Sequence, residues 1–171
     1  MASATPKEYL ERIGFVLSYP LSDTNNLDNK LAIQFNKLLA KLNHKFPDYF
    51  PASVYKDYLI TTAYTNDKNL HQENNLIVSN EKNLLRLKEE FNNLEFIICF
   101  GEKAYFAAQK VKEVYDLKYK VIKTKSFAYP VSRHIKTLYN NNNNKHFRAN
   151  FHVLTQFNDI DKQFSEKKRF K

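Results

Sequence analysis

The fold of this chain can be predicted best from the stretch LEFIICFGEKAYFAA, at residues 94–108. Its five apolar residues from Phe96 to Phe100 follow one another without a charge, which is typical of a strand buried on both faces. Gly101, one of only two glycines in the chain, comes next. A helical pattern then begins, with these residues on one face: Ala104, Ala107, Ala108, Val111 and Val114. A strand, a glycine and a helix with small residues indicate an open α/β sheet, in which ligands bind outside the carboxyl ends of the strands.

Further strands alternate with helices along the chain. We expect strands at residues 15–18, 58–63 and 120–124, and helices at residues 27–42 and 81–94. The strand at 120–124 alternates polar and apolar residues, so we expect an edge strand with one solvated face. The alternation predicts an α/β fold, a three-layer sandwich with a four-stranded parallel sheet flanked by helices.

Both ends of the chain are expected to be helical. Thr5 is a suitable cap for a short helix that ends at Gly14, and Ser132 is a suitable cap for another helix. A last helix at residues 145–168 precedes a basic tail and carries an apolar stripe at steps of three and four: Phe147, Phe151, Leu154, Phe157, Ile160 and Phe164. We find no repeat and no linker, so the sequence predicts one domain over residues 1–171.

Charge and composition narrow the function classes. Lys and Arg number 27 against 18 Asp and Glu, a formal net charge of +9. This charge favours an anionic partner, such as DNA, RNA, a nucleotide or an acidic membrane surface. The alternative is that a Lys- and Asn-rich composition reflects an AT-rich genome.

The single cysteine and the hydropathy pattern exclude several classes. Cys99 rules out an intrachain disulfide and a cysteine metal site, which fits a reducing compartment. No apolar segment approaches the ~20 residues that cross a bilayer, and residues 1–14 lack the apolar part of a secretory signal. We therefore expect a cytoplasmic or nucleoid-associated protein with no membrane contact, no metal and no cofactor.

Three polar loops follow predicted strands and meet at one edge of a parallel sheet. They read YPLSDTNN after residue 18, TTAYTND from residue 61 and KSFAYPVSRH from residue 125. Function concentrates at such loops, although Asx and Pro residues there are also ordinary turn formers.

The order of these motifs resembles the uracil-DNA glycosylase superfamily. FVLSYPLSDTNN stands where that family keeps its water-activating motif, and YLITTAYTND is similar to its base-reading strand. IICFGEKAYFAA resembles the third strand and the following helix, and KSFAYPVSRHIKTL resembles the closing motif. The resemblance covers about residues 7–140 and implies a metal-independent enzyme that hydrolyses the N-glycosidic bond of uracil or another modified base in DNA.

The chemistry of base excision suggests a role for each candidate residue. A flipped base needs aromatic stacking and polar groups that read its edge. An acidic or amide group places the attacking water, and a donor stabilises the departing anion. The candidates are Asp23 and His134 for catalysis, Tyr19, Thr62, Tyr64 and Tyr129 for base binding, and Ser132, Arg133, Lys125 and Lys103 for DNA phosphates.

Two other interpretations stay open. Tyr19 precedes Pro20 without a preceding glycine, and Tyr129 stands before Pro130 where the family usually has His. These departures favour a catalytically lapsed member of the fold that binds DNA or a partner. The other interpretation is a different α/β enzyme with a nucleotide or phosphate site. The sequence does not indicate an oligomeric state.

Overall fold

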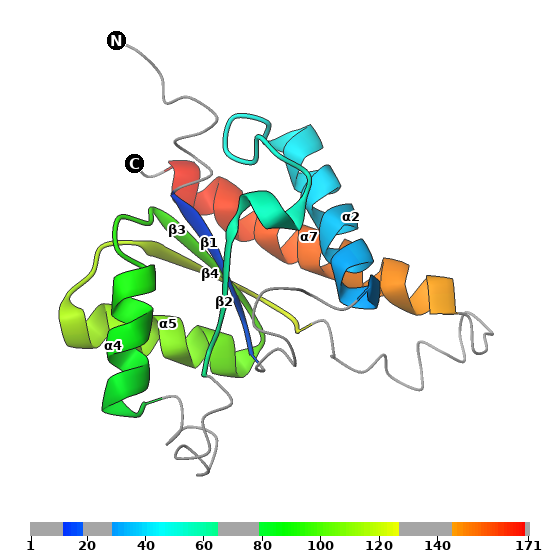
Figure 1. Cartoon of the computed structure of the whole chain (residues 1–171). Helices are drawn as coiled ribbons and strands as arrows, with labels where there is room; N and C mark the ends of the chain where they lie inside the picture. The colour runs from blue at the N-terminus through cyan, green and yellow to red at the C-terminus, as the bar shows by residue number, and fades with distance from the viewer. Residues whose placement is uncertain (1–11, 19–28, 65–78, 127–144, 170–171) are drawn as a thin grey trace.

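A four-stranded, all-parallel sheet forms the centre of the molecule (Figure 1). The computed structural model describes residues 12–18, 29–64, 79–126 and 145–169. The strands are β1 (Ile13–Leu17), β2 (Leu59–Thr62), β3 (Phe96–Phe100) and β4 (Lys120–Thr124), in the order β2-β1-β3-β4. The predicted parallel sheet is confirmed, and β4 is an edge strand as expected.

Helices cover both faces of the sheet. They are α2 (Asn29–Lys45), α4 (Glu81–Glu90), α5 (Glu102–Tyr115) and α7 (Lys145–Arg169), with a short 3-10 turn, η1 (Tyr55–Asp57), before β2. Helices α2 and α7 lie together on one face, and α4 and α5 lie on the other (Figure 1). The predicted three-layer sandwich is therefore confirmed.

The direction of winding changes between the two central strands. The chain passes from β1 outward to β2, returns across β1 to β3, and continues outward to β4. Strands β1 and β3 are thus neighbours from which the chain departs in opposite directions. In open α/β sheets, such a switch point leaves a crevice at the carboxyl ends of the two strands, where ligands bind.

The face under α2 and α7 is filled by aromatic rings. Phe164 of α7 is fully buried, and its ring centroid lies 4.7 Å from that of Phe96, 4.9 Å from that of Phe46 and 5.0 Å from that of Tyr49. Edge-to-face and tilted pairs at these separations add to the free energy of burying the rings themselves. Phe164 consequently joins α7 to β3 and to the loop after α2.

The face under α4 and α5 has smaller side chains. Ala104, Ala107 and Ala108 of α5 are fully buried, so the helix lies close to the strands, as the sequence predicts. Val114, expected on the same face, is instead 50% exposed, whereas Tyr115, four residues after Val111, packs against the core on this face. Asn80 caps α4 by accepting from the Lys82 N–H at 3.0 Å.

Strand β1 begins earlier than the sequence predicts. Ile13 and Gly14 belong to this strand, so the expectation of a helix that ends at Gly14 is wrong; the start of that helix lies outside the described residues. A Cβ atom at position 14 would come 2.8 Å from Cδ1 of Leu94. The glycine therefore serves close packing within a strand and does not end a helix.

The stripe on α7 also differs from its prediction. Leu154 is 51% exposed, whereas Val153 and Gln156 are buried beside Ile160 and Phe164. The buried face includes Gln156, which donates to the Lys125 carbonyl just beyond β4 at 3.0 Å. The side chains of Phe147 and Phe151 lie outside the described part of the chain.

Polar side chains of α7 also cover the outer edge of β4. The amide of Gln163 accepts from the Lys123 N–H at 2.9 Å and donates to the Lys123 carbonyl at 2.6 Å, as another strand would. Val121 and Ile122, on opposite faces of β4, are both buried, so the expected solvated face is wrong. At Lys123, these bonds occupy the backbone groups that a strand from another chain would use. Within the described ranges, no helix has the length and apolar character that crossing a membrane requires.

Candidate functional site

The carboxyl ends of the four strands meet at one edge of the sheet. In the strand register, Leu17 pairs with Thr62 on one side and Phe100 on the other, and Phe100 pairs with Thr124. Two backbone bonds continue the alignment beyond the strands, from Ala63 N to Leu17 O at 2.8 Å and from Gly101 N to Thr124 O at 2.9 Å. We call this line of strand ends the carboxyl rim.

Ser18 and Gly101 occupy the switch point on the carboxyl rim. The Ser18 hydroxyl donates to the Phe100 carbonyl at 2.6 Å and accepts from the Ala104 N–H at 3.3 Å. Gly101 has φ +106°, and a Cβ atom there would come 2.4 Å from the Ser18 Oγ. Only glycine adopts this backbone conformation readily, and its missing side chain makes room for the serine. Ser18 therefore joins β1, the end of β3 and the first turn of α5.

Tyr64 and Lys103 are candidate residues that the fold brings together. The Lys103 Nζ lies 5.5 Å from the centre of the Tyr64 ring, a cation–π distance. Tyr64 follows β2, and Lys103 lies in the first turn of α5 after β3. Both side chains are half-buried and keep part of their surface in solvent. The Tyr64 ring also packs against the core under α4 and α5, so only part of it faces solvent. A partly exposed aromatic ring beside a cation is suited to stacking a base next to its phosphate.

Thr62 and Lys125 also lie on the carboxyl rim. Thr62 ends β2, is 9% exposed, and donates its hydroxyl proton to the Tyr64 carbonyl at 2.7 Å. Lys125 follows β4, its side chain is exposed, and its carbonyl accepts from Gln156 at 3.0 Å. Lys125 comes after the outer strand β4 and Thr62 ends the opposite outer strand, β2.

The other candidates lie outside the described residues. These are Asp23, His134, Tyr19, Tyr129, Ser132 and Arg133. Asp23 and Tyr19 follow β1 in the chain, and the other four follow β4, so their segments leave strands that end at the carboxyl rim.

Sequence reasoning missed a polar cluster between α4 and β2. Asn83 is 3% exposed and donates to the Ala63 carbonyl at 2.7 Å. Arg86 donates to the Thr62 carbonyl at 2.9 Å and forms an ion pair with Glu90 at 2.9 Å. The three side chains recur at steps of three and four along α4, next to the apolar stripe. That spacing was the available signal, but the same pattern is also typical of a solvated helix flank.

Burial changes the titration of several groups near the sheet. It raises the pKa of the Cys99 thiol well above its usual value, which keeps this buried cysteine unreactive. It lowers the pKa of the Arg86 guanidinium, against the opposing effect of Glu90. Among the described residues, no three His, Cys, Asp or Glu side chains gather in a way that could hold a metal ion.

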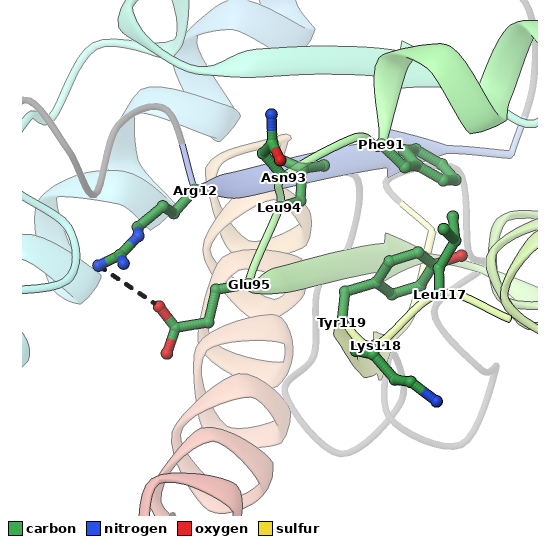
Figure 2. A pocket seen from close by; sticks show the side chains of 8 residues that line it. All are labelled: Arg12, Phe91, Asn93, Leu94, Glu95, Leu117, Lys118 and Tyr119. Carbon is green, nitrogen blue, oxygen red and sulfur yellow. Dashed lines mark ion pairs between the residues drawn. The ribbon is translucent and has the colours of Figure 1, made fainter.

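A hollow of about 460 Å³ lies at the opposite, amino edge of the sheet (Figure 2). Apolar side chains line it together with polar ones: Phe91, Leu94, Leu117, Tyr119, Arg12, Asn93, Glu95 and Lys118. Three of the polar residues already have structural partners, since Arg12 pairs with Glu95 at 3.8 Å and the Tyr119 hydroxyl donates to the Ala108 carbonyl at 2.6 Å. We therefore interpret the hollow as a junction of element ends and retain the carboxyl rim as the candidate site.

Comparison of the chain with protein-family models, curated proteins and solved structures gives no match.

Proposed function

We propose that this protein is a DNA glycosylase-like enzyme that binds DNA at the carboxyl rim and hydrolyses the N-glycosidic bond of uracil or another modified base. The observation that carries the proposal is the pair of Tyr64 and Lys103, whose ring and ammonium group lie 5.5 Å apart at this edge. The net charge of +9 supports a polyanionic partner. The corresponding location is the cytoplasm or the nucleoid.

The proposed reaction needs a base outside the duplex. The flipped base would stack on Tyr64, while Lys103 and Lys125 would contact neighbouring phosphates. By the family resemblance, Asp23 orients the attacking water and His134 stabilises the anionic base as the glycosidic bond breaks. Tyr19 and Tyr129 would add stacking surface, and Ser132 with Arg133 would hold a phosphate at a helix start.

Thr62 constrains which base edge can be read. Because its hydroxyl proton is committed to the Tyr64 carbonyl at 2.7 Å, its oxygen has only acceptor capacity left. It therefore suits a base that presents a donor at the contact, such as a ring N–H or an exocyclic amino group.

A second candidate function is DNA binding without catalysis. The Ser18 hydroxyl occupies the switch point above Gly101, with bonds to the Phe100 carbonyl and the Ala104 N–H. A switch point filled by the protein's own side chain favours a binding surface over a deep catalytic crevice.

A single-tryptophan variant tests the binding step. The chain contains no Trp, so Tyr64→Trp introduces the sole indole fluorophore on the carboxyl rim. Single-stranded DNA should quench this fluorescence by stacking, and higher salt should weaken the binding. Tyr115→Trp is the matched control, because the Tyr115 ring has Lys88 at 5.2 Å but lies at the other end of α5. Equal quenching in both variants, or none in either, would refute binding at the carboxyl rim.

The catalytic step is tested separately. Oligonucleotides with uracil or other altered bases are incubated with the protein and then cleaved with alkali at abasic sites. Abasic product that disappears in Asp23→Ala and His134→Ala supports the glycosylase. Saturable quenching with no abasic product across a broad panel of bases supports the binder instead.

A further inference from the structure

Three consecutive backbone carbonyls at the end of β2 are each held by a side chain. The Thr62 carbonyl accepts from Arg86 Nη2 at 2.9 Å, and the Ala63 carbonyl accepts from Asn83 Nδ2 at 2.7 Å. The Tyr64 carbonyl accepts from the Thr62 hydroxyl at 2.7 Å. The backbone that carries the Tyr64 ring is therefore fixed by side-chain bonds beyond the end of the strand.

Asn83 and Arg86 form one connected unit on α4. Arg86 Nη2 also donates to the Asn83 Oδ1 at 2.9 Å, which turns the Asn83 amide nitrogen toward the Ala63 carbonyl. Arg86 Nη1 donates to the Thr61 hydroxyl at 3.0 Å and to Glu90 at 2.9 Å. The Thr61 hydroxyl in turn donates to Glu90 at 2.7 Å. The guanidinium thus bridges helix and strand with a fixed geometry that a more flexible lysine lacks.

The polar cluster of Asn83, Arg86 and Glu90 attaches α4 to the sheet at a cost in desolvation free energy. The side chain of Arg86 is only 27% exposed, and its buried Nε has no hydrogen-bond partner in the described part of the chain. Partly buried ion pairs are often no more stabilising than apolar side chains of the same volume, but in some proteins they select one arrangement of the groups that they join. Leu84 and Leu87, on the same helix, already supply apolar contact with the sheet.

We infer that Asn83 and Arg86 are positioning residues that orient the Tyr64 ring for stacking. The inference deepens the proposed function and rests on it. Neither residue touches the base; each acts through the carbonyls of residues 62 and 63. The same bonds keep the ring beside Lys103, which sits on the neighbouring helix α5.

The experiment uses the Tyr64→Trp protein as the parent and adds Asn83→Ala, Arg86→Met or Leu84→Ala. Leu84 is the matched control because it lies between the two positions on α4, is buried, and has only an apolar side chain. Unfolding is measured for every variant by denaturant, and DNA affinity is measured by quenching of the introduced indole well below each midpoint. We expect Asn83→Ala and Arg86→Met to bind single-stranded DNA about tenfold more weakly than the parent. Leu84→Ala should lose stability and keep the parent's affinity.

Two results overturn the inference. One is the same DNA affinity in all variants, and the other is a loss of affinity in Leu84→Ala as large as that in Asn83→Ala and Arg86→Met. Arg86→Lys, which retains the charge but not the planar fork, should recover only part of the affinity. If the parent itself shows no quenching by DNA, the proposed function fails and positioning is judged from the fluorescence anisotropy of the indole alone. Higher local mobility of the indole in Asn83→Ala and Arg86→Met than in Leu84→Ala would then support the positioning role. Equal mobility would refute it.

Discussion

The two glycines of this chain provide a stringent test of the packing at the switch point. Gly101 has φ +106° and ψ 173°, a conformation that L-residues rarely adopt, whereas Gly14 lies in the regular strand β1. An added Cβ would approach the Ser18 Oγ to 2.4 Å at position 101 and Cδ1 of Leu94 to 2.8 Å at position 14. Both sites are crowded, but only position 101 also has a forbidden backbone conformation.

We predict that Gly101→Ala lowers the free energy of unfolding by about 3–5 kcal/mol. About 1–3 kcal/mol comes from the backbone conformation. The rest comes from displacing the Ser18 hydroxyl from its bonds to the Phe100 carbonyl and the Ala104 N–H, at about 1 kcal/mol each. In a chain of 171 residues this corresponds to a fall in Tm of about 10 °C.

Gly14→Ala is the control. Its neighbours are the ends of the flexible Leu94 and Leu59 side chains rather than backbone atoms, so we expect a loss of about 1 kcal/mol. Urea unfolding followed by circular dichroism measures both variants. A Gly101→Ala protein no less stable than Gly14→Ala would refute the reasoning. Ser18→Ala should cost less in the Gly101→Ala background than alone, because the two positions share the same space.

Two further predictions concern the core. Phe164→Ala should lower the free energy of unfolding by about 3–5 kcal/mol, because the buried ring contacts four aromatic neighbours. Leu154→Ala, on the same helix but at a position that is 51% exposed, should change the urea midpoint little. Similar losses of stability in the two variants would contradict the observed buried face of α7. Burial raises the pKa of Tyr58 from 10.0 to about 12, so the unfolded phenol loses its proton first and stability should fall between about pH 10 and pH 12. Tyr58→Phe should be less stable at neutral pH, since the Tyr58 hydroxyl donates to the Ala52 carbonyl at 2.6 Å. Between about pH 10 and pH 12, however, the urea midpoint of this variant should fall less steeply than that of the parent. An equally steep fall would show that Tyr58 is not the group that titrates.

The sequence predicted those residues of the candidate site whose position depends only on where the strands end. Thr62, Tyr64, Lys103 and Lys125 lie on the carboxyl rim, because residues that follow parallel strands must emerge at one edge. The contact between Tyr64 and Lys103 did not follow from this rule, since it depends on the separation of β2 from α5. The bonds of Asn83 and Arg86 to β2 were not predicted either, because a polar residue beside an apolar stripe is usually solvated.

Local properties of the sequence were enough to predict the centre of the molecule. Residues 96–100 are apolar without interruption, so a strand formed by them must be buried on both faces. The glycine that follows permits the φ of +106° at the turn. Both effects depend on only a few neighbouring residues. The boundaries of the buried faces, in contrast, depend on contacts between distant segments. Gln156 is fully buried and donates to the Lys125 carbonyl just beyond β4, and Gln163 bonds to Lys123 of the edge strand, whereas Leu154 is exposed. Helical periodicity predicts which side of one helix is apolar. Which residues at the border of that side are buried depends on hydrogen bonds to a strand that is distant in sequence.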